Sequence, residues 1–309
     1  MAKFFLVLAV FLLTSKATSA TSLSELKRFW HEKVATTCEG YPSKESCDDG
    51  DSTIFNGLLC LSGLELGCSA VRESQDADGR FWRSPRRKRN LNFGEKNSFS
   101  RDQAMGVLAY LARTKDREAA TRWLGWIEAN RPCSVKNPFN GKCSIKGTHR
   151  LCRGDKDEVC TITPIVWSMM GRVWRYLDIS RHELMKRYEG IESSDPEVEL
   201  VKRTKAGYRL HLKAIQSHIR NYMGQGITSR IMKVLLKKEG DNPYFRYVAY
   251  GPTSYQLEKV KDLCPNQNDD IGFRRFQWAW ERATASEAWL ESMGWDCIFM
   301  ANLLEQVES

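Results

Sequence analysis

The sequence predicts an all-helical protein of one domain, stapled by disulfide bonds. Helix-capping patterns recur along the chain, strand-like alternation of apolar and polar residues is nearly absent, and the cysteines form an even set of 10. The first 20 residues, MAKFFLVLAVFLLTSKATSA, have the layout of a secretory signal peptide that ends at Ala20. We therefore expect an exported protein, secreted or periplasmic, with one helical domain over residues 21–309.

The apolar run of this leader, Phe4 to Leu13, is too short for a membrane anchor, since a helix needs about 20 apolar residues to span a bilayer. No later stretch is long and apolar enough either, so we expect no membrane span. An exported chain with an even cysteine count is typical of a disulfide framework. Pairing neighbours in sequence predicts five bonds: Cys38–Cys47, Cys60–Cys68, Cys133–Cys143, Cys152–Cys160 and Cys264–Cys297.

The four cysteines between residues 133 and 160 leave an interleaved pairing open. A zinc cluster is the alternative for the same four, but no Cys-x-x-Cys occurs and His149 is the nearest imidazole, so we expect no metal. The chain also lacks a phosphate-binding loop and a dinucleotide fingerprint, which argues against a nucleotide cofactor. The expected cofactor content is therefore none.

Capping signals place the first helices. Asp51 or Ser52 precedes TIFNGLLCLSG, and Ser100 with Gln103 forms a capping box before a helix that is apolar on most faces. A short turn, TKDRE, leads into AATRWLGWIEAN, whose apolar residues form a single stripe. A helix that is apolar all round, followed by a one-sided helix, is typical of an inner and outer pair.

Further helices follow the same rules. Thr163 and Pro164 begin TITPIVWSMMGRVWRYL, since a proline at the first helical position loses no hydrogen bond. GYRLHLKAIQSHIRNYMG and SRIMKVLLKKEG are helical, and Thr284 with Glu287 forms a capping box in ATASEAWLESMGWDCIFMANLLEQ. Residues 76–97 and 132–160 are expected as long irregular loops, which in compact domains are usually functional or disordered.

Glycines inside the predicted helices indicate close packing of helix backbones. Gly57, Gly106, Gly171 and Gly294 each cost about 1 kcal/mol relative to alanine in a helix. Gly57 and Gly106 both follow their proposed caps by six residues. We expect inner helices to approach one another at these glycines.

Four segments carry a resemblance: DDGDSTIFNGLLC, DADGRFWRSP, NSFSRDQAMG and FQWAWERATASEAW. With the helical hairpins around them they resemble the (α/α) toroids of several glycoside hydrolases and polysaccharide lyases. The resemblance covers most of the chain as architecture, while no catalytic signature of one family matches. The resemblance implies a protein that acts on a glycan. Because the chain is short for six hairpins, the implied toroid is smaller or incomplete.

The resemblance implies a site where the N-terminal ends of the inner helices gather. Glycoside cleavage uses two carboxyl groups, one protonated and one ionised. Glu281 is the expected acid, because flanking tryptophans raise a carboxyl pKa, and Asp51 or Asp102 is the expected base or nucleophile. Aromatic and charged side chains of the same regions are the expected substrate-binding set: Asp49, Trp82, Arg83, Arg101, His149, Trp278, Trp280 and Arg282.

Each acid proposed for catalysis also has an alternative structural role. Asp102 stands in the first turn of a helix, where the helix dipole stabilises an acid by about 0.3–1 kcal/mol. Asp51 is a candidate N-cap, and Glu281 with Arg282 is a candidate buried ion pair. Asp76-x-Asp78-Gly79 resembles half of a calcium loop, but no complete loop follows.

The leading hypothesis is therefore an exported glycan-active enzyme, a hydrolase or a lyase, with a glycan or other anionic polymer as substrate. One alternative is a non-catalytic protein that binds an anionic partner through the basic run SPRRKRNLN, residues 84–92, in a chain of net charge +9. Another alternative is a metal-dependent hydrolase of phosphoesters or lipids that uses His149, His211 or His218. The last two lie seven residues apart on one helix face.

Overall fold

The computed structural model describes residues 22–44, 47–90, 94, 96, 98–154, 157–226, 229–267, 269, 280 and 294–308. The predicted signal peptide and the Thr284 capping box lie outside these residues. Within them, no helix has the length and apolar character needed to cross a membrane.

The described chain is mostly helical. The N-terminal half contains α1 (Leu23–Phe29), a π-helical turn η1 (Trp30–Val34), α2 (Ser52–Leu61), α3 (Glu65–Glu73), α4 (Pro85–Arg89), α5 (Arg101–Thr114), α6 (Arg117–Ala129) and α7 (Asp157–Cys160). The C-terminal half contains α8 (Pro164–Tyr176), α9 (Glu183–Arg187), a 3-10 turn η4 (Ile191–Ser193), α10 (Asp195–Arg203), α11 (Tyr208–Tyr222), α12 (Ser229–Lys238), α13 (Pro243–Tyr250), α14 (Ser254–Leu263) and α16 (Trp295–Glu308).

Among the described residues, two small antiparallel hairpins accompany the helices. One pairs β1 (Thr36–Cys38) with β2 (Tyr41–Ser43), and the other pairs β3 (Cys133–Lys136) with β4 (Cys143–Lys146). The second hairpin lies inside the expected loop 132–160, which also contains α7, and the expected loop 76–97 contains α4. Both segments are thus more regular than the sequence indicated, because short hairpins and single helical turns leave little periodicity to detect.

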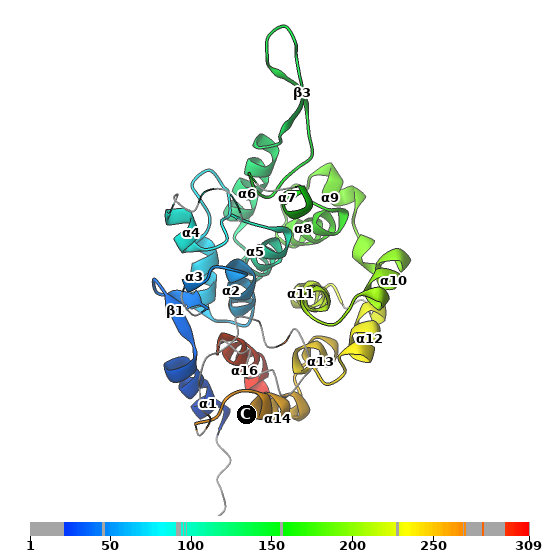
Figure 1. The fold of residues 1–309 in the computed structure, drawn as a ribbon. Helices are drawn as coiled ribbons and strands as arrows, with labels where there is room; N and C mark the ends of the chain where they lie inside the picture. The colour runs from blue at the N-terminus through cyan, green and yellow to red at the C-terminus, as the bar shows by residue number, and fades with distance from the viewer. Residues whose placement is uncertain are drawn as a thin grey trace, which may run out of the picture.

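Six helices contact one another in a closed order. α2 packs on α5, α5 on α11, α11 on α13, α13 on α14, α14 on α16, and α16 returns to α2. Figure 1 shows α3, α6, α9, α10 and α12 outside this set. The prediction of a helical protein is confirmed to the extent that the described chain is mostly helical with two small strand pairs, whereas the (α/α) toroid stays a prediction.

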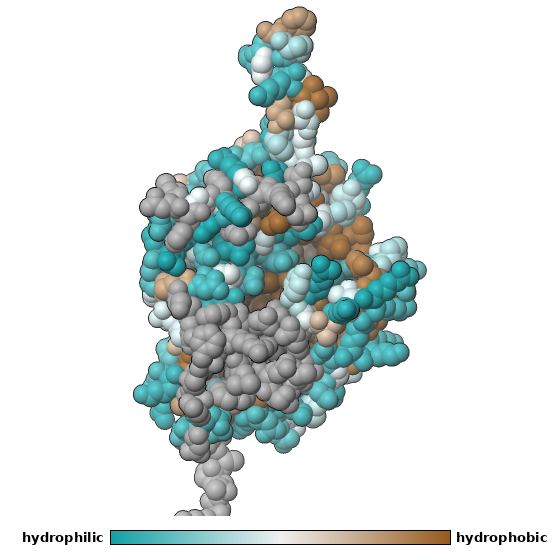
Figure 2. Space-filling view, in the orientation of Figure 1, coloured by the Kyte–Doolittle hydropathy of each residue, from teal (hydrophilic) through white to brown (hydrophobic). Residues whose placement is uncertain are grey.

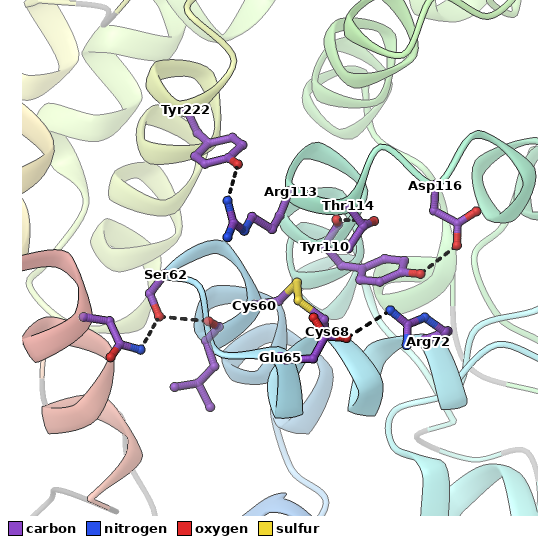
Figure 3. The surroundings of a disulfide bond; sticks show 12 residues. Cys60, Ser62, Glu65, Cys68, Arg72, Tyr110, Arg113, Thr114, Asp116 and Tyr222 are labelled. Carbon is purple, nitrogen blue, oxygen red and sulfur yellow. Dashed lines mark hydrogen bonds and ion pairs between the residues drawn. A yellow bond between two sulfur atoms is a disulfide. The ribbon is translucent and has the colours of Figure 1, made fainter. Parts of the chain in front are cut away.

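Contacts at both helix ends show that α2, α5 and α11 run in the same direction. At the starts, the Thr53 amide of α2 donates to Gln103 Oε1 of α5 over 2.9 Å. At the far ends, Arg113 of α5 donates to the Tyr222 hydroxyl of α11 over 3.1 Å, as Figure 3 shows. The first residues of these helices therefore gather at one end of the molecule.

α2 and α5 cross at two glycines. A Cβ atom on Gly57 would lie 2.1 Å from the Gly106 carbonyl oxygen, and a Cβ atom on Gly106 would lie 2.1 Å from the Thr53 carbonyl oxygen. Real Cβ atoms do not approach backbone so closely, so only glycine permits this crossing. The predicted close approach is confirmed for this pair. A Cβ atom on Gly171 of α8 would likewise lie 3.0 Å from the Met185 carbonyl oxygen of α9.

Gly294 departs from the prediction. It precedes α16 instead of lying within a helix, and its φ of +77° is in the left-handed region that favours glycine. A Cβ atom there would also lie 2.7 Å from the Ala35 amide nitrogen. The sequence analysis placed Gly294 inside a helix because apolar residues flank it on both sides, and their pattern does not reveal the change of backbone direction at the glycine.

α5 and α6 form the predicted inner and outer pair. In α5 every residue from Gln103 to Ala112 is buried, whereas α6 buries one face through Ala119, Ala120, Trp123, Trp126 and Ile127. Trp123 contacts Phe81, Phe99 and Trp174 through its ring. This aromatic cluster joins the outer helix to the core.

All five disulfide bonds connect the cysteines that sequence proximity paired: Cys38–Cys47, Cys60–Cys68, Cys133–Cys143, Cys152–Cys160 and Cys264–Cys297. Four of them close short segments, with sequence separations of 8 to 10 residues. The fifth joins α14 to α16 across 33 residues. Figure 3 shows Cys60–Cys68 linking α2 to α3.

The glycine crossing gives a stability prediction. Gly106→Ala must push α2 and α5 apart, so we expect a loss of about 1–3 kcal/mol or more in the free energy of unfolding. Gly125→Ala, in α6, is the matched control, because a Cβ atom there meets nothing within 4 Å. The control should gain up to about 1 kcal/mol from helix propensity. Urea unfolding followed by circular dichroism measures both, and equal effects would contradict the proposed crossing.

Candidate functional site

Asp51 and Asp102, two acids predicted for the site, both lie at the end of the molecule where α2, α5 and α11 begin. Asp51 stands at the N-cap position of α2, and Asp102 lies in the first turn of α5. Asp51 is close enough for its charge to raise the pKa of Asp102. Carboxyl groups from two separate helices therefore share one electrostatic environment.

Asp51 does not act as a helix cap. Its side chain makes no capping hydrogen bond, and its backbone has a left-handed φ of 60°. The Asp51 carboxylate instead accepts a hydrogen bond from Gln103 Nε2 over 3.3 Å and lies 4.0 Å from Lys44 Nζ. The left-handed backbone, which aspartate tolerates better than most residues, turns this carboxylate away from its own helix and toward α5.

Gln103 has a different role from the one expected. The sequence placed it in a capping box with Ser100, and Ser100 does cap α5 by accepting from the Gln103 amide over 3.4 Å. The Gln103 side chain, however, bonds to α2: its oxygen accepts from the Thr53 amide, and its nitrogen donates to Asp51. Gln103 therefore satisfies an unpaired amide at the start of a neighbouring helix and positions Asp51 at the same time.

Three arginines act on Asp102 through their charge. Arg83, Arg101 and Arg209 each lower its pKa through their charge, and Arg209 comes from the first turn of α11. The Arg83 backbone is fixed between both helices: its amide donates to Ser98 over 2.8 Å, and its carbonyl accepts from the Thr53 hydroxyl over 2.6 Å. Side chains from α2, α5, α11 and the segment before α4 thus contribute to the same cluster.

The net result for Asp102 is a raised pKa. Burial is the largest cause, the charge of Asp51 is the second, and the three arginines oppose both without cancelling them. Asp102 therefore keeps its proton to a higher pH than an ordinary aspartate does, as a carboxyl group that donates a proton requires. We name Asp51, Arg83, Arg101, Asp102, Gln103 and Arg209 the mouth cluster.

Two tryptophans expected to stack on a sugar are buried. Trp82 is 5% exposed, with the Arg80 guanidinium 3.7 Å above its ring and its indole nitrogen donating to Asp76 over 3.2 Å. Trp280 is 0% exposed, and its indole nitrogen donates to the Asp296 carbonyl over 2.9 Å. Their burial argues against a stacking role, because neither ring presents a face to a ligand.

The Asp76 to Gly79 segment is built as a structural turn. Each carboxylate accepts from a backbone amide and from an indole, Asp76 from Trp82 and Asp78 from Trp126 over 3.1 Å. Each of the four carboxylate oxygens in this segment therefore accepts a hydrogen bond within the chain.

Asp49 and the basic run are engaged with each other and with nearby backbone. Asp49 lies 4.0 Å from Arg87, and Lys88 donates to the Gln75 carbonyl over 3.0 Å. Arg86 donates to the Cys47 carbonyl over 2.8 Å, and Arg89 pairs with Glu39. The run folds as α4 with all four basic side chains bonded within the chain, which weakens the hypothesis that it binds an anionic partner.

Glu281, Trp278 and Arg282 lie outside the described residues, so the expected acid and two of its neighbours stay predictions.

His149 belongs to a second cluster that the sequence did not indicate. Its Nε2 lies 2.8 Å from Glu128 Oε1 at the end of α6, and the same oxygen lies 2.7 Å from Nε2 of His182. Trp167 of α8 stacks on His182 with ring centroids 5.1 Å apart and meets His149 edge-on at 5.2 Å. Glu128 and His182 are far apart in sequence and carry no motif, so only their proximity identifies them.

Two histidines and one carboxylate are also a donor set for zinc. In the part of the chain that the structure describes, these three are the only group of at least three such side chains with ligand atoms within 4.8 Å of one another. His182, however, accepts the Leu184 amide at Nδ1 over 3.0 Å, so the neutral ring carries its proton on Nε2, the atom that would bind the metal. The residues as arranged fit a hydrogen-bonded cluster and not a metal centre.

His211 and His218 are core residues of α11. Both are fully buried and contact Tyr244, with His218 Nδ1 3.2 Å from the Tyr244 hydroxyl. Burial lowers the pKa of each to about 3, so both rings are neutral at physiological pH. They lie on one face, as their spacing predicts, but no third ligand joins them among the described residues.

Comparison of the chain with protein-family models, with curated proteins and with solved structures finds no match. The fold and the two clusters are therefore interpreted from their own geometry.

The buried histidines predict acid sensitivity. Their folded pKa lies below the ordinary value of 6.5, so the unfolded chain takes up protons first as the pH falls. The contribution of these histidines to the free energy of unfolding is fully present above about pH 6.5. Below that pH, each histidine lowers the free energy of unfolding by about 1.4 kcal/mol per pH unit. Urea unfolding between pH 7.5 and about pH 5 measures the slope.

His218→Phe should reduce this pH slope by about 1.4 kcal/mol per pH unit, whatever it does to stability at neutral pH, because one buried histidine with a lowered pKa is gone. His31→Gln is the control, since the His31 side chain is exposed. An unchanged slope in the His218 variant would contradict the neutral buried state.

Proposed function

We propose that the protein is an enzyme acting on an acidic glycan, with the mouth cluster as its active site. The observation that carries the proposal is that Asp51 and Asp102, at the starts of two separate helices, are close enough for the charge of Asp51 to raise the pKa of Asp102, while three arginines oppose that shift through their charge. Glycan cleavage needs one carboxyl group that keeps its proton and one that is ionised. The different environments of these two aspartates favour that division.

Asp102 is the proposed proton donor. It is half-buried, and burial with the charge of Asp51 raises its pKa. Asp51 is mostly exposed, with 62% of its side chain accessible, and Gln103 holds its carboxylate in place. This assignment differs from the sequence-based one, in which Glu281 was the acid.

The arginines point to an acidic substrate. Arg83, Arg101 and Arg209 concentrate positive charge where two acids would otherwise repel a uronate or sulfate group. A guanidinium group binds carboxylate and sulfate oxygens through paired hydrogen bonds, so the cluster favours acidic over neutral sugars. A panel of uronate-containing, sulfated and neutral polysaccharides tests this preference.

Asp102→Asn should lower kcat by at least about 100-fold, because an amide cannot transfer the proton. If Asp102 only complements the helix dipole, the same variant should lose about 0.3–1 kcal/mol of stability and keep its activity. Asp195→Asn, at an exposed acid in the first turn of α10, is the matched control. Reducing-end release reports hydrolysis, and the ultraviolet absorbance of an unsaturated uronate reports elimination.

Arg209→Gln should shift the pH profile. Arg209 opposes the raised pKa of Asp102, so removing its charge moves that pKa further up. The limb of the kcat/KM profile that reports loss of the Asp102 proton should therefore move to higher pH. Arg203→Gln, an exposed arginine at the end of α10, should leave the profile unchanged. A shift to lower pH would contradict the arrangement.

A further inference from the structure

The β3–β4 hairpin projects from the body of the molecule (Figure 1). Its two strands are joined by the Cys133–Cys143 disulfide. At its base, the Gly147 amide donates to the Pro132 carbonyl over 2.6 Å, and at its turn the Asn137 amide donates to the Lys142 carbonyl over 2.7 Å. The hairpin is thus cross-linked by a disulfide between two hydrogen-bonded ends.

Large apolar side chains of this hairpin face solvent. Phe139, at the turn, is 96% exposed, and Val135 and Ile145 pair across the strands at 47% and 57%. Figure 2 shows apolar atoms at the end of the projection. Such residues contribute nothing to the core, and exposed apolar side chains on a projecting strand pair mark an interaction surface.

The charge of the hairpin has one sign. Lys136, Lys142 and Lys146 lie on it, and the sequence has no acidic residue from 129 to 154. Unlike the α4 bases, none of these three lysines forms an ion pair with the described part of the chain. An anionic surface is therefore the complementary partner.

We propose that the β3–β4 hairpin attaches the protein to a membrane surface rich in anionic lipids. Phe139 enters the boundary between headgroups and acyl chains, while Lys136, Lys142 and Lys146, set back from the tip, contact the lipid phosphates. An apolar tip followed by basic residues combines the two contributions to interfacial binding, buried apolar area and attraction to anionic lipids.

Composition favours a lipid surface over a protein partner. Protein interfaces are enriched in Tyr, Trp and Arg and depleted of Lys, whereas this hairpin has three lysines and, from residue 133 to 146, no Tyr, Trp or Arg. A lysine ammonium group is a point charge that needs no fixed partner geometry, which suits a fluid array of headgroups. A protein partner would also have to supply a pocket for Phe139, and a lipid interface does not.

Co-sedimentation of the full chain with vesicles tests the proposal. We expect binding to phosphatidylcholine vesicles that contain phosphatidylserine, little binding to phosphatidylcholine alone, and weaker binding as salt rises. Phe139→Ala should weaken binding by at least about ten-fold. Neutralising one lysine should weaken it about five-fold, and the triple variant K136Q/K142Q/K146Q should abolish it.

Matched controls remove the same groups elsewhere. K205Q/K233Q/K237Q neutralises three exposed lysines of the body, and Leu200→Ala removes an exposed apolar side chain of α10. Both should bind like the parent chain, and all variants should keep its melting temperature.

The proposal is overturned if neutral and anionic vesicles bind equally, or if the hairpin variants and the controls behave alike. It is also overturned if the chain binds heparin or a partner protein through the hairpin and does not bind vesicles. None of these outcomes depends on catalytic activity, so the result is separate from that for the mouth cluster.

Discussion

The crossing of α2 and α5 at Gly57 and Gly106 is the contact on which the rest of the structure depends. Because neither residue has a side chain, the two backbones touch, and their first turns lie close enough for Gln103 to bond to α2. A larger residue at either position would push the two helices apart. The position of Asp51 relative to Asp102 is therefore set by a backbone contact several residues away, in a part of each helix that takes no part in chemistry.

The distribution of charge separates structural groups from candidate functional ones. Glu192 is buried but bonded to Ser168 and Arg172, which ties α8 to η4 in the way that buried charges require. The α4 bases are bonded to neighbouring carbonyls and carboxylates. Asp102 is different, because burial and a second acid both oppose its ionisation. A pKa shifted by burial and by a specific neighbouring charge is typical of a functional site.

The disulfide bonds also divide into those that hold the helical body together and one that shapes a candidate functional element. Cys60–Cys68 and Cys264–Cys297 join helices of the body, whereas Cys133–Cys143 closes a hairpin that buries almost nothing. A cross-link within a fully exposed element maintains a shape and adds little to a core. The hairpin is therefore built as a rigid projection, and its lysines and Phe139 remain available to a partner.

Local patterns in the sequence were enough for the helical class, the cysteine pairs, the inner and outer roles of α5 and α6, and the close approach at Gly57 and Gly106. Each of these depends on spacing over a few residues, through helical periodicity, capping or short loop closure. The sequence also selected Asp51 and Asp102, but it could not show that Gln103 reaches across to α2 or that Arg209 joins them.

Only the tertiary structure decided which side chains meet. It buried Trp82 and Trp280, bonded the α4 bases internally, and joined Glu128, His149 and His182, which lie as many as 54 residues apart. The physical reason is that capping and periodicity act along the chain, whereas burial, charge pairing and pKa depend on neighbours that packing brings from distant segments.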